Sequence, residues 1–446
     1  MALLLIHIIG AILWIIVGTS RLRINPLICL ATASIWVGMA AGLEFLHALE
    51  EFTKGFGSLI GQIGLIIILG CVLGVLLEKS RAAFVLAQVI WQYFGKKIPA
   101  LSTTFMGYLV GIPVFCDSGF ILLNPIGKNL AKTSGISPLT FSLSLAGGLY
   151  LSHILIPPTP GPLAVAGIFQ MEQHLGLILL MGGVISIPVF FVITWWANRF
   201  KNQFTVNHDK AEDTASYNER KLPSAGIPTL VILLPLVLIT LGNLTQFVSQ
   251  AQIVSLIQIL GNPVVAISIG VMIGLLFLKD WDSGQGMMET AFRSGIASAG
   301  PILILTGAGA GFGAILRQAN LEQMFTNLGA TEDAGGVFWI LLAFGLTAFL
   351  KTAQGSSTSA MIIGASIVLS VVPAALLVSD IYTVLIMASI GAGATAVSHA
   401  NDSYFWIVKE FTGLTVKEAL KSFSLLSGLM AATTLVTILL IYGLVA

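Results

Sequence analysis

The segment Gly111-Ile-Pro-Val-Phe-Cys-Asp-Ser-Gly119 interrupts an apolar run that extends over residues 100–127. A membrane-spanning helix needs roughly 20 mainly apolar residues. Inside a bilayer the backbone can leave the helix only where protein or a water-filled cavity satisfies its polar groups. Because Asp117 places a carboxylate between Phe115 and Phe120, this stretch predicts a broken membrane segment rather than a continuous helix.

Three further apolar regions are interrupted by polar or proline-rich segments: residues 139–170 by 156–162, residues 336–378 by 351–359, and residues 381–408 by 398–403. Eight apolar spans are continuous: Ala2–Gly18, Ile24–Leu43, Ser58–Leu77, Leu175–Ala197, Ile227–Gly242, Pro263–Leu278, Ile296–Leu316 and Ser424–Val445. Continuous apolar runs are typical of helices rather than of a membrane β-barrel. The sequence therefore predicts an all-α polytopic membrane protein.

The composition supports this prediction. Of the 446 residues, 56% are hydrophobic and only 9% are charged, whereas a soluble domain carries about 25% charged residues. A net charge of +1 provides no basic field for nucleic acid. The chain also lacks a P-loop, a nucleophile elbow and cysteines at metal-ligand spacing. We therefore expect no enzyme activity, no nucleic-acid partner, no metal and no cofactor.

Two halves of the chain share a pattern. Residues 198–226 are polar, with nine charges within Arg199–Lys221, and we interpret them as a cytoplasmic linker between a first repeat, residues 1–197, and a second repeat, residues 227–446. The recurring features are Gly70 and Gly74 with Gly309 and Gly313, a polar break, and the Ser-His pairs at 152–153 and 398–399. The alternative is chance similarity among glycine-rich helices.

The distribution of basic residues predicts the topology. If residues 100–127 form an inner re-entrant hairpin and residues 336–378 an outer one, 18 of the 21 Lys and Arg residues lie on the cytoplasmic side, as the positive-inside rule requires. This arrangement gives about ten full crossings, broken helices at 139–170 and 381–408, and both termini outside. The two hairpins then open to opposite sides, which is the inverted-repeat arrangement that alternating access uses.

The four breaks predict one central polar site. The N-terminus of a half-helix presents unpaired N–H groups and a partial positive charge, which suit an anion. Ser and Thr hydroxyls suit carboxylates and hydroxyl groups, so we expect a small, polar, anionic substrate. The residues that we expect to bind it are Ser118, Gly119, Thr159, Gly355, Ser356, Ser357, Thr358, Asn401, Ser403, Lys351 and His399.

Asp117, His153 and Asp402 are the candidates for proton coupling. A carboxylate inside the membrane is costly and is a functional hypothesis by default, and histidine can titrate near neutral pH. We expect Asp117 to carry the proton, with His153 or Asp402 in second place. The structural alternatives are helix capping for the two aspartates and a satisfied structural role for His153 and His399. Lys351 either pairs with an anionic substrate or extends toward the membrane surface.

Four segments resemble sequence blocks of the gluconate permease family of proton symporters, which belongs to the ion-transporter superfamily of anion carriers. They are Gly111-Ile-Pro-Val-Phe-Cys-Asp-Ser-Gly-Phe-Ile-Leu-Leu123, His153-Ile-Leu-Ile-Pro-Pro-Thr-Pro-Gly161, Gln354-Gly-Ser-Ser-Thr358 and His399-Ala-Asn-Asp-Ser-Tyr-Phe-Trp406. The similarity extends along nearly the whole chain, and the four blocks together are specific.

The resemblance implies proton-coupled uptake of gluconate or a related small hydroxylated carboxylate at a bacterial inner membrane. Relatives in the family carry D-serine, idonate and other small hydroxy acids. The superfamily fold that it implies has a scaffold part and a transport part with two re-entrant hairpins, often as a homodimer. By analogy with the superfamily, the transport part moves like an elevator.

Three residues depart from the family pattern. Asp117 stands where many relatives have Glu, Thr159 where some have His, and Ser357 where Ala is common. Asp117 keeps the carboxylate, whereas Thr159 removes a group that can titrate or bind substrate, which is compatible with a smaller hydroxy acid than gluconate. The alternative function is a sodium-coupled carrier of a small carboxylate or D-serine on the same fold. A channel or a membrane-embedded enzyme is the third hypothesis.

Overall fold

The computed structural model describes residues 2–95, 97–134, 136–200, 226–243, 251–277, 286–318 and 335–445. Within these ranges every regular element is a helix, which confirms the all-α prediction. Most of the predicted linker, residues 201–225, lies outside the described residues. The α-helices are α1 Ala2–Ser20, α2 Pro26–Ala40, α3 Phe45–Lys79, α4 Ala82–Ile90, α5 Pro99–Gly111, α6 Cys116–Ser134, α7 Pro138–Leu155, α8 Pro160–Ile168, α9 Leu175–Asn198, α10 Gly226–Asn243, α11 Ala251–Gly261, α12 Pro263–Phe277, α13 Met287–Gln318, α15 Gly335–Gln354, α16 Ser357–Val371, α17 Asp380–Gly393, α18 Ser403–Thr412, α19 Val416–Ala419 and α20 Leu425–Val445.

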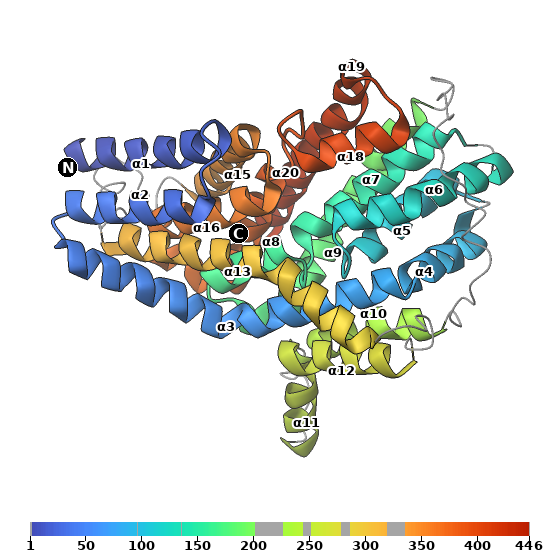
Figure 1. The fold of residues 1–446 in the computed structure, drawn as a ribbon, viewed down its shortest axis with the longest axis horizontal. Coiled ribbons are helices and arrows are strands. Elements are labelled where there is room, and N and C mark those ends of the chain that lie inside the picture. The colour runs from blue at the N-terminus through green and yellow to red at the C-terminus, as the bar shows by residue number, and fades with distance from the viewer. Residues whose placement is uncertain are drawn as a thin grey trace.

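The helices are those of a polytopic membrane protein. In the described part of the chain, six helices are long and apolar enough to cross a membrane, or up to seven if one bent pair counts as a span. That pair is α11 and α12, which meet at 67°, and α11 projects away from the body of the molecule (Figure 1). The ten crossings, the inverted repeats and the position of the termini stay predictions.

Two long helices, α3 and α13, pack along each other beside α1 and α2 (Figure 1). Glycines permit this close contact, because a Cβ on Gly55 would lie only 2.9 Å from the carbonyl oxygen of Ala310. Small residues generally allow membrane helices to approach closely. α3 is longer than the predicted span Ser58–Leu77, because it begins at Phe45 with a polar N-terminal part that an apolar window does not detect.

The four interrupted regions fold as pairs of helices joined at a break. α5 meets α6 at residues 112–115, α7 meets α8 at 156–159, α15 meets α16 at 355–356, and α17 meets α18 at 394–402. α5 packs along α7, α15 along α17, α16 against α8 and α18 against α6. These contacts interleave the two halves of the chain around the breaks.

The first break lies earlier in the chain than its polar residues suggest. The sequence predicts an interruption over residues 111–119, whereas Asp117, Ser118 and Gly119 belong to the start of α6 and the chain leaves the helix only at residues 112–115. Pro113 explains the difference, because proline has no N–H to continue α5 and its ring clashes with the preceding turn. Asp117 is therefore placed at the N-terminus of a helix.

The recurring glycines of α3 and α13 both face broken helices. A Cβ on Gly74 would overlap the carbonyl oxygen of Pro113, and one on Gly70 would lie 3.5 Å from that of Pro158. On α13, a Cβ on Gly309 would overlap Ile362 of α16. Each long helix thus places its recurring glycines against broken helices of its own half of the chain, whereas other glycines of α3 and α13 pack between the two long helices.

We expect Gly74→Ala to lower the melting temperature of the purified protein. The added Cβ meets a backbone carbonyl that cannot rotate away, and overpacking of this kind costs about 1–3 kcal/mol. Gly57→Ala is the matched control on the same helix, because nothing lies within 4 Å of its added Cβ. Equal melting temperatures for the two variants would contradict the tight contact between α3 and the first break.

Candidate functional site

A cavity of about 560 Å³ lies where the broken helices meet. Its volume is in the range typical of small-molecule sites. The first turns of α6, α16 and α18, the end of α15 and side chains of α7 and α13 form its wall. Ten of the residues predicted for the site line this cavity: Asp117, Ser118, His153, Gly355, Ser356, Ser357, Thr358, Asn401, Asp402 and Ser403.

Three helices begin at the wall of this cavity. α6 begins at Cys116, α16 at Ser357 and α18 at Ser403. The first N–H groups of a helix have no partner within that helix, and the N-terminus carries a partial positive charge. Three such termini therefore meet at one cavity, where Asp402 caps α18 and Asp117 lies in the first turn of α6.

Asp117 is the carboxylate of the cavity with the weakest partners. Its oxygens accept a 3.4 Å hydrogen bond from the Ser403 hydroxyl and lie 3.7 Å from the Cys116 sulfur. Its side chain is half-buried, and none of the ion pairs among the described residues includes it. Among the described residues, Asp117 is therefore a carboxylate of the cavity without a cationic side chain in an ion pair.

Asp402 and Lys351 form an ion pair that is buried from water. The ammonium Nζ lies 2.7 Å from Asp402 Oδ2 and also donates to the carbonyl oxygen of Gly355 at 2.6 Å. Asp402 further accepts hydrogen bonds from the Ser398 hydroxyl at 2.5 Å and from the N–H of Tyr404 at 3.1 Å, which makes it the N-cap of α18.

The burial of this pair bears on two predictions. The Lys351 side chain is 0% exposed, so the interpretation that it extends toward the membrane surface is wrong. Lys351 also does not line the cavity, and its ammonium is held by protein oxygens. For Asp402, the capping alternative is present in the structure.

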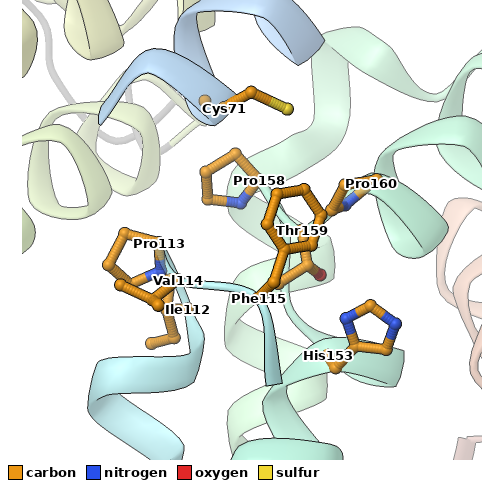
Figure 2. A pocket seen from close by; sticks show the side chains of 10 residues that line it. Cys71, Ile112, Pro113, Val114, Phe115, His153, Pro158, Thr159 and Pro160 are labelled. Carbon is orange, nitrogen blue, oxygen red and sulfur yellow. The ribbon is translucent and has the colours of Figure 1, made fainter. Parts of the chain in front are cut away.

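His153 borders a second, much smaller pocket as well as the main cavity. The residues at the first two breaks lie on either side of this small pocket, with Cys71 of α3 close by (Figure 2). His153 Nε2 lies 3.5 Å from the Thr358 hydroxyl, so this contact connects the two halves of the chain. Thr159 lines the small pocket rather than the cavity. Its hydroxyl donates to the carbonyl oxygens of Ile156 and Ser152.

Two other predicted residues also lie outside the cavity wall. Gly119 is packed so that an added Cβ would lie 2.7 Å from the Leu149 side chain. His399 Nε2 lies 3.0 Å from the carbonyl oxygen of Thr352, which also accepts a 2.8 Å hydrogen bond from the Asn401 amide. His399 and Asn401 therefore fasten the fourth break to the end of α15.

Gly355 is required by the shape of the third break. Its φ of +81° is left-handed, and an added Cβ would overlap the backbone carbonyl of Asn401. Only glycine fits a position that combines this conformation with such close backbone contact. Because Gly355 has no side chain, the backbone of the third break can lie against the backbone of Asn401 at the cavity wall.

Tyr150 and Tyr404 line the cavity without having been predicted. The Tyr150 hydroxyl lies 2.8 Å from the Ser357 hydroxyl, and the Tyr404 hydroxyl donates to the carbonyl oxygen of Ala146 at 3.1 Å. Their rings are 5.4 Å apart. One signal was available, because Tyr150 precedes His153 by three residues and residues at that spacing share a helix face. Ser298, Ile302 and Gln354 also line the cavity.

Comparisons with known proteins identify the family of the chain and a similar fold. Residues 2–445 match the family model described as GntP family permease. An uncharacterized permease of Haemophilus influenzae is 32% identical over 438 residues, which are 92% of this chain and 86% of the relative. The gluconate permease of Pseudomonas aeruginosa is 29% identical over 449 residues, which are 99% of this chain and 98% of the relative. The crystal structure of the YdaH transporter of Alcanivorax borkumensis is 16% identical, with a TM-score of 0.66 over 90% of this chain and 89% of that chain.

The fold is therefore that of an integral membrane transporter. The chain belongs to the GntP family of permeases, which confirms the resemblance to gluconate permeases seen in the four sequence blocks. The relatives are named as permeases rather than enzymes, in agreement with the prediction of a transport protein without enzyme activity.

We expect Lys351→Met to lower the melting temperature of the purified protein strongly. The substitution leaves the Asp402 carboxylate buried without its cation, and breaking a buried pair from one side costs about 3–5 kcal/mol. The double variant Lys351→Met/Asp402→Asn removes both charges and should recover part of the loss.

Lys54→Met is the control for this experiment. It breaks an ion pair of similar length, 2.8 Å, in which the Lys54 side chain is 66% exposed, and exposed pairs contribute little to stability. Its melting temperature should equal that of the wild type. A double variant that is no more stable than Lys351→Met would contradict the proposed cause.

Proposed function

We propose that this protein is a secondary active transporter of the bacterial inner membrane, which carries a small hydroxylated carboxylate such as gluconate into the cell together with a proton. The observation that carries the proposal is the composition of the cavity wall. Three helix N-termini, which suit an anion, share it with Asp117, a half-buried carboxylate outside the described ion pairs.

The helix N-termini bind the substrate carboxylate. Ser118 on α6 and Ser356, Ser357 and Thr358 at the start of α16 line the cavity there, and their hydroxyls supply donors beside the backbone N–H groups. Asn401 and Ser403 at the fourth break face the same cavity and bind substrate hydroxyls. Thr159 has no part in this, because its hydroxyl donates within its own break.

The charge balance of the cavity explains why a proton accompanies the anion. Lys351 and Asp402 neutralise each other, so Asp117 determines the remaining charge among the described lining carboxylates. An ionised Asp117 repels an anionic substrate in this low-dielectric site, and protonation removes the repulsion. His153 on the same wall is the second candidate carrier, whereas Asp402 is less suited because Lys351 and Ser398 hold its carboxylate.

Transport requires that the cavity open to each side of the membrane in turn. In the proposal, the four broken helix pairs form the transport part, while α3 and α13 belong to a scaffold, and two copies of the chain form a homodimer. The contacts of Gly70 and Gly74 with the first two breaks are then part of the boundary between the transport part and the scaffold. The name of the gluconate permease from Pseudomonas aeruginosa supports a sugar acid as the cargo.

Proteoliposomes test the coupling ion directly. We expect labelled gluconate to accumulate under an imposed pH gradient without sodium, and a protonophore to abolish the accumulation because it dissipates the driving force. Protein-free liposomes are the control. Accumulation that depends on a sodium gradient and not on the pH gradient would overturn proton coupling. Absence of gradient-driven uptake of gluconate, glycerate and D-serine would overturn the substrate class.

We expect Asp117→Asn to abolish uphill uptake and to spare exchange of substrate across the membrane. The amide keeps the size of the carboxyl group and removes the exchangeable proton, so the loaded cavity still forms but no longer carries a proton. Asp380→Asn is the matched control, because Asp380 lies at the start of α17, is 51% exposed and pairs with His174 at 3.4 Å. Full uphill uptake by the Asp117 variant would remove Asp117 from the mechanism.

A further inference from the structure

Gln354 presents an unexplained polar group at the wall of the cavity. It is the last residue of α15 and directly precedes the left-handed Gly355. The residue lines the cavity, yet its Oε1 and Nε2 atoms are both shielded from water and have no hydrogen-bond partner in the structure. Leaving a buried polar group unpaired costs about 1–3 kcal/mol, so such a group needs a reason.

A structural role at the end of α15 does not supply that reason. The carbonyl oxygen of Lys351 accepts the N–H of Gly355 at 2.8 Å. The carbonyl oxygen of Thr352 is contacted by His399 and Asn401. Other residues therefore satisfy these two carbonyls, and the Gln354 amide does not cap the helix.

Neighbouring polar groups of the cavity already have protein partners. The Ser357 hydroxyl contacts Tyr150, and the Ser356 hydroxyl accepts the N–H of Ser359. Apart from Gln354, one other lining residue has a buried side-chain atom without a partner, His153 at Nδ1. Among the solvent-shielded side-chain atoms of the described wall, those without a partner thus belong to one amide and one imidazole.

The chemistry of the amide indicates which part of a ligand it fits. A carboxamide offers a donor and an acceptor side by side. A carboxylate only accepts, so it cannot satisfy Oε1. A hydroxyl group both donates and accepts, and two neighbouring hydroxyls can satisfy Oε1 and Nε2 at once.

We propose that Gln354 is a specificity-determining residue that binds the hydroxyl groups of the substrate, while the helix N-termini bind its carboxylate. This inference rests on the proposed function and assigns a residue to the polyhydroxylated end of the substrate. It explains why an amide without a protein partner lies beside the cavity. In the proposal the Gln354 side chain turns into the cavity when substrate binds, because its two polar atoms are covered in the structure without ligand. The proposal also predicts that the Gln354 amide lowers the stability of the protein without ligand and raises its affinity for the substrate.

The test measures ligand binding to purified protein in detergent, without any ion gradient. The probes are gluconate and a series of deoxygluconates, each lacking one hydroxyl group. The variant is Gln354→Met, which keeps the length of the side chain and removes both hydrogen-bonding atoms. The control is Gln318→Met at the end of α13, where the exposed Gln318 amide lies 3.4 Å from Glu51.

The expected result is a coupling between residue and hydroxyl. Gln354→Met should bind gluconate about ten-fold more weakly than the wild type, in line with the loss of one or two hydrogen bonds. At least one deoxygluconate should have a similarly reduced affinity for the wild type, compared with gluconate. The variant should bind that deoxygluconate no more weakly than it binds gluconate. Such non-additivity identifies groups in direct contact. Gln318→Met should behave as the wild type with every ligand.

Stability separates this role from a purely structural one. If the amide awaits a ligand, Gln354→Met without ligand should keep or raise the melting temperature, because an unpaired polar group is removed. A lower melting temperature, or equal losses of affinity for gluconate and for every deoxygluconate, would overturn the proposal.

The same assay distinguishes failure of this proposal from failure of the proposed function. The binding assay can show non-additivity between Gln354→Met and loss of a substrate hydroxyl while wild-type proteoliposomes fail to accumulate gluconate under a pH gradient. That result would contradict proton-coupled uptake and leave Gln354 as a hydroxyl-binding residue. A wild type that binds none of these acids would contradict both.

Discussion

The buried ion pair between Lys351 and Asp402 holds two of the four breaks together, across 51 positions of sequence. Unwound backbone persists at membrane depth only where protein groups or a water-filled cavity satisfy it. The other breaks follow the same rule, because Tyr150 reaches from the first half to Ser357 and to the carbonyl oxygen of Ala394. The third and fourth breaks are thus completed by residues from other broken helix pairs, and these contacts hold part of the cavity wall in place.

Much of the fold could be predicted because the residue types at each helix break differ from those in the surrounding apolar helices. Proline, glycine and small polar residues inside apolar runs located all four breaks to within a few residues. The errors have equally local causes. Pro113 ends α5 before the polar residues of the predicted interruption. The predicted span Ser58–Leu77 misses the start of α3, because residues 45–57 include charged side chains. Crossing number and sidedness depend on the membrane and stay predictions.

The site was predicted less completely, because side-chain partners are set by tertiary contacts. Nothing near Lys351 in the sequence indicates that Asp402 is its partner. Thr159 and Gly119 carry the same composition signal as their neighbours, and only packing turns one toward its own backbone and the other toward Leu149. Tyr150 and Tyr404 are indistinguishable by type from core aromatics, since aromatic residues are normally buried in apolar helices.

The glycine contacts of α3 have a mechanical consequence. At Gly74 and Gly70 the helix meets carbonyl groups of Pro113 and Pro158, so backbone faces backbone there and these two positions present no side chain that interlocks. Packed side chains give an interface discrete, bistable positions because they must disengage before they move. In the proposed mechanism, fewer side chains must therefore disengage at Gly70 and Gly74 before the transport part moves along α3.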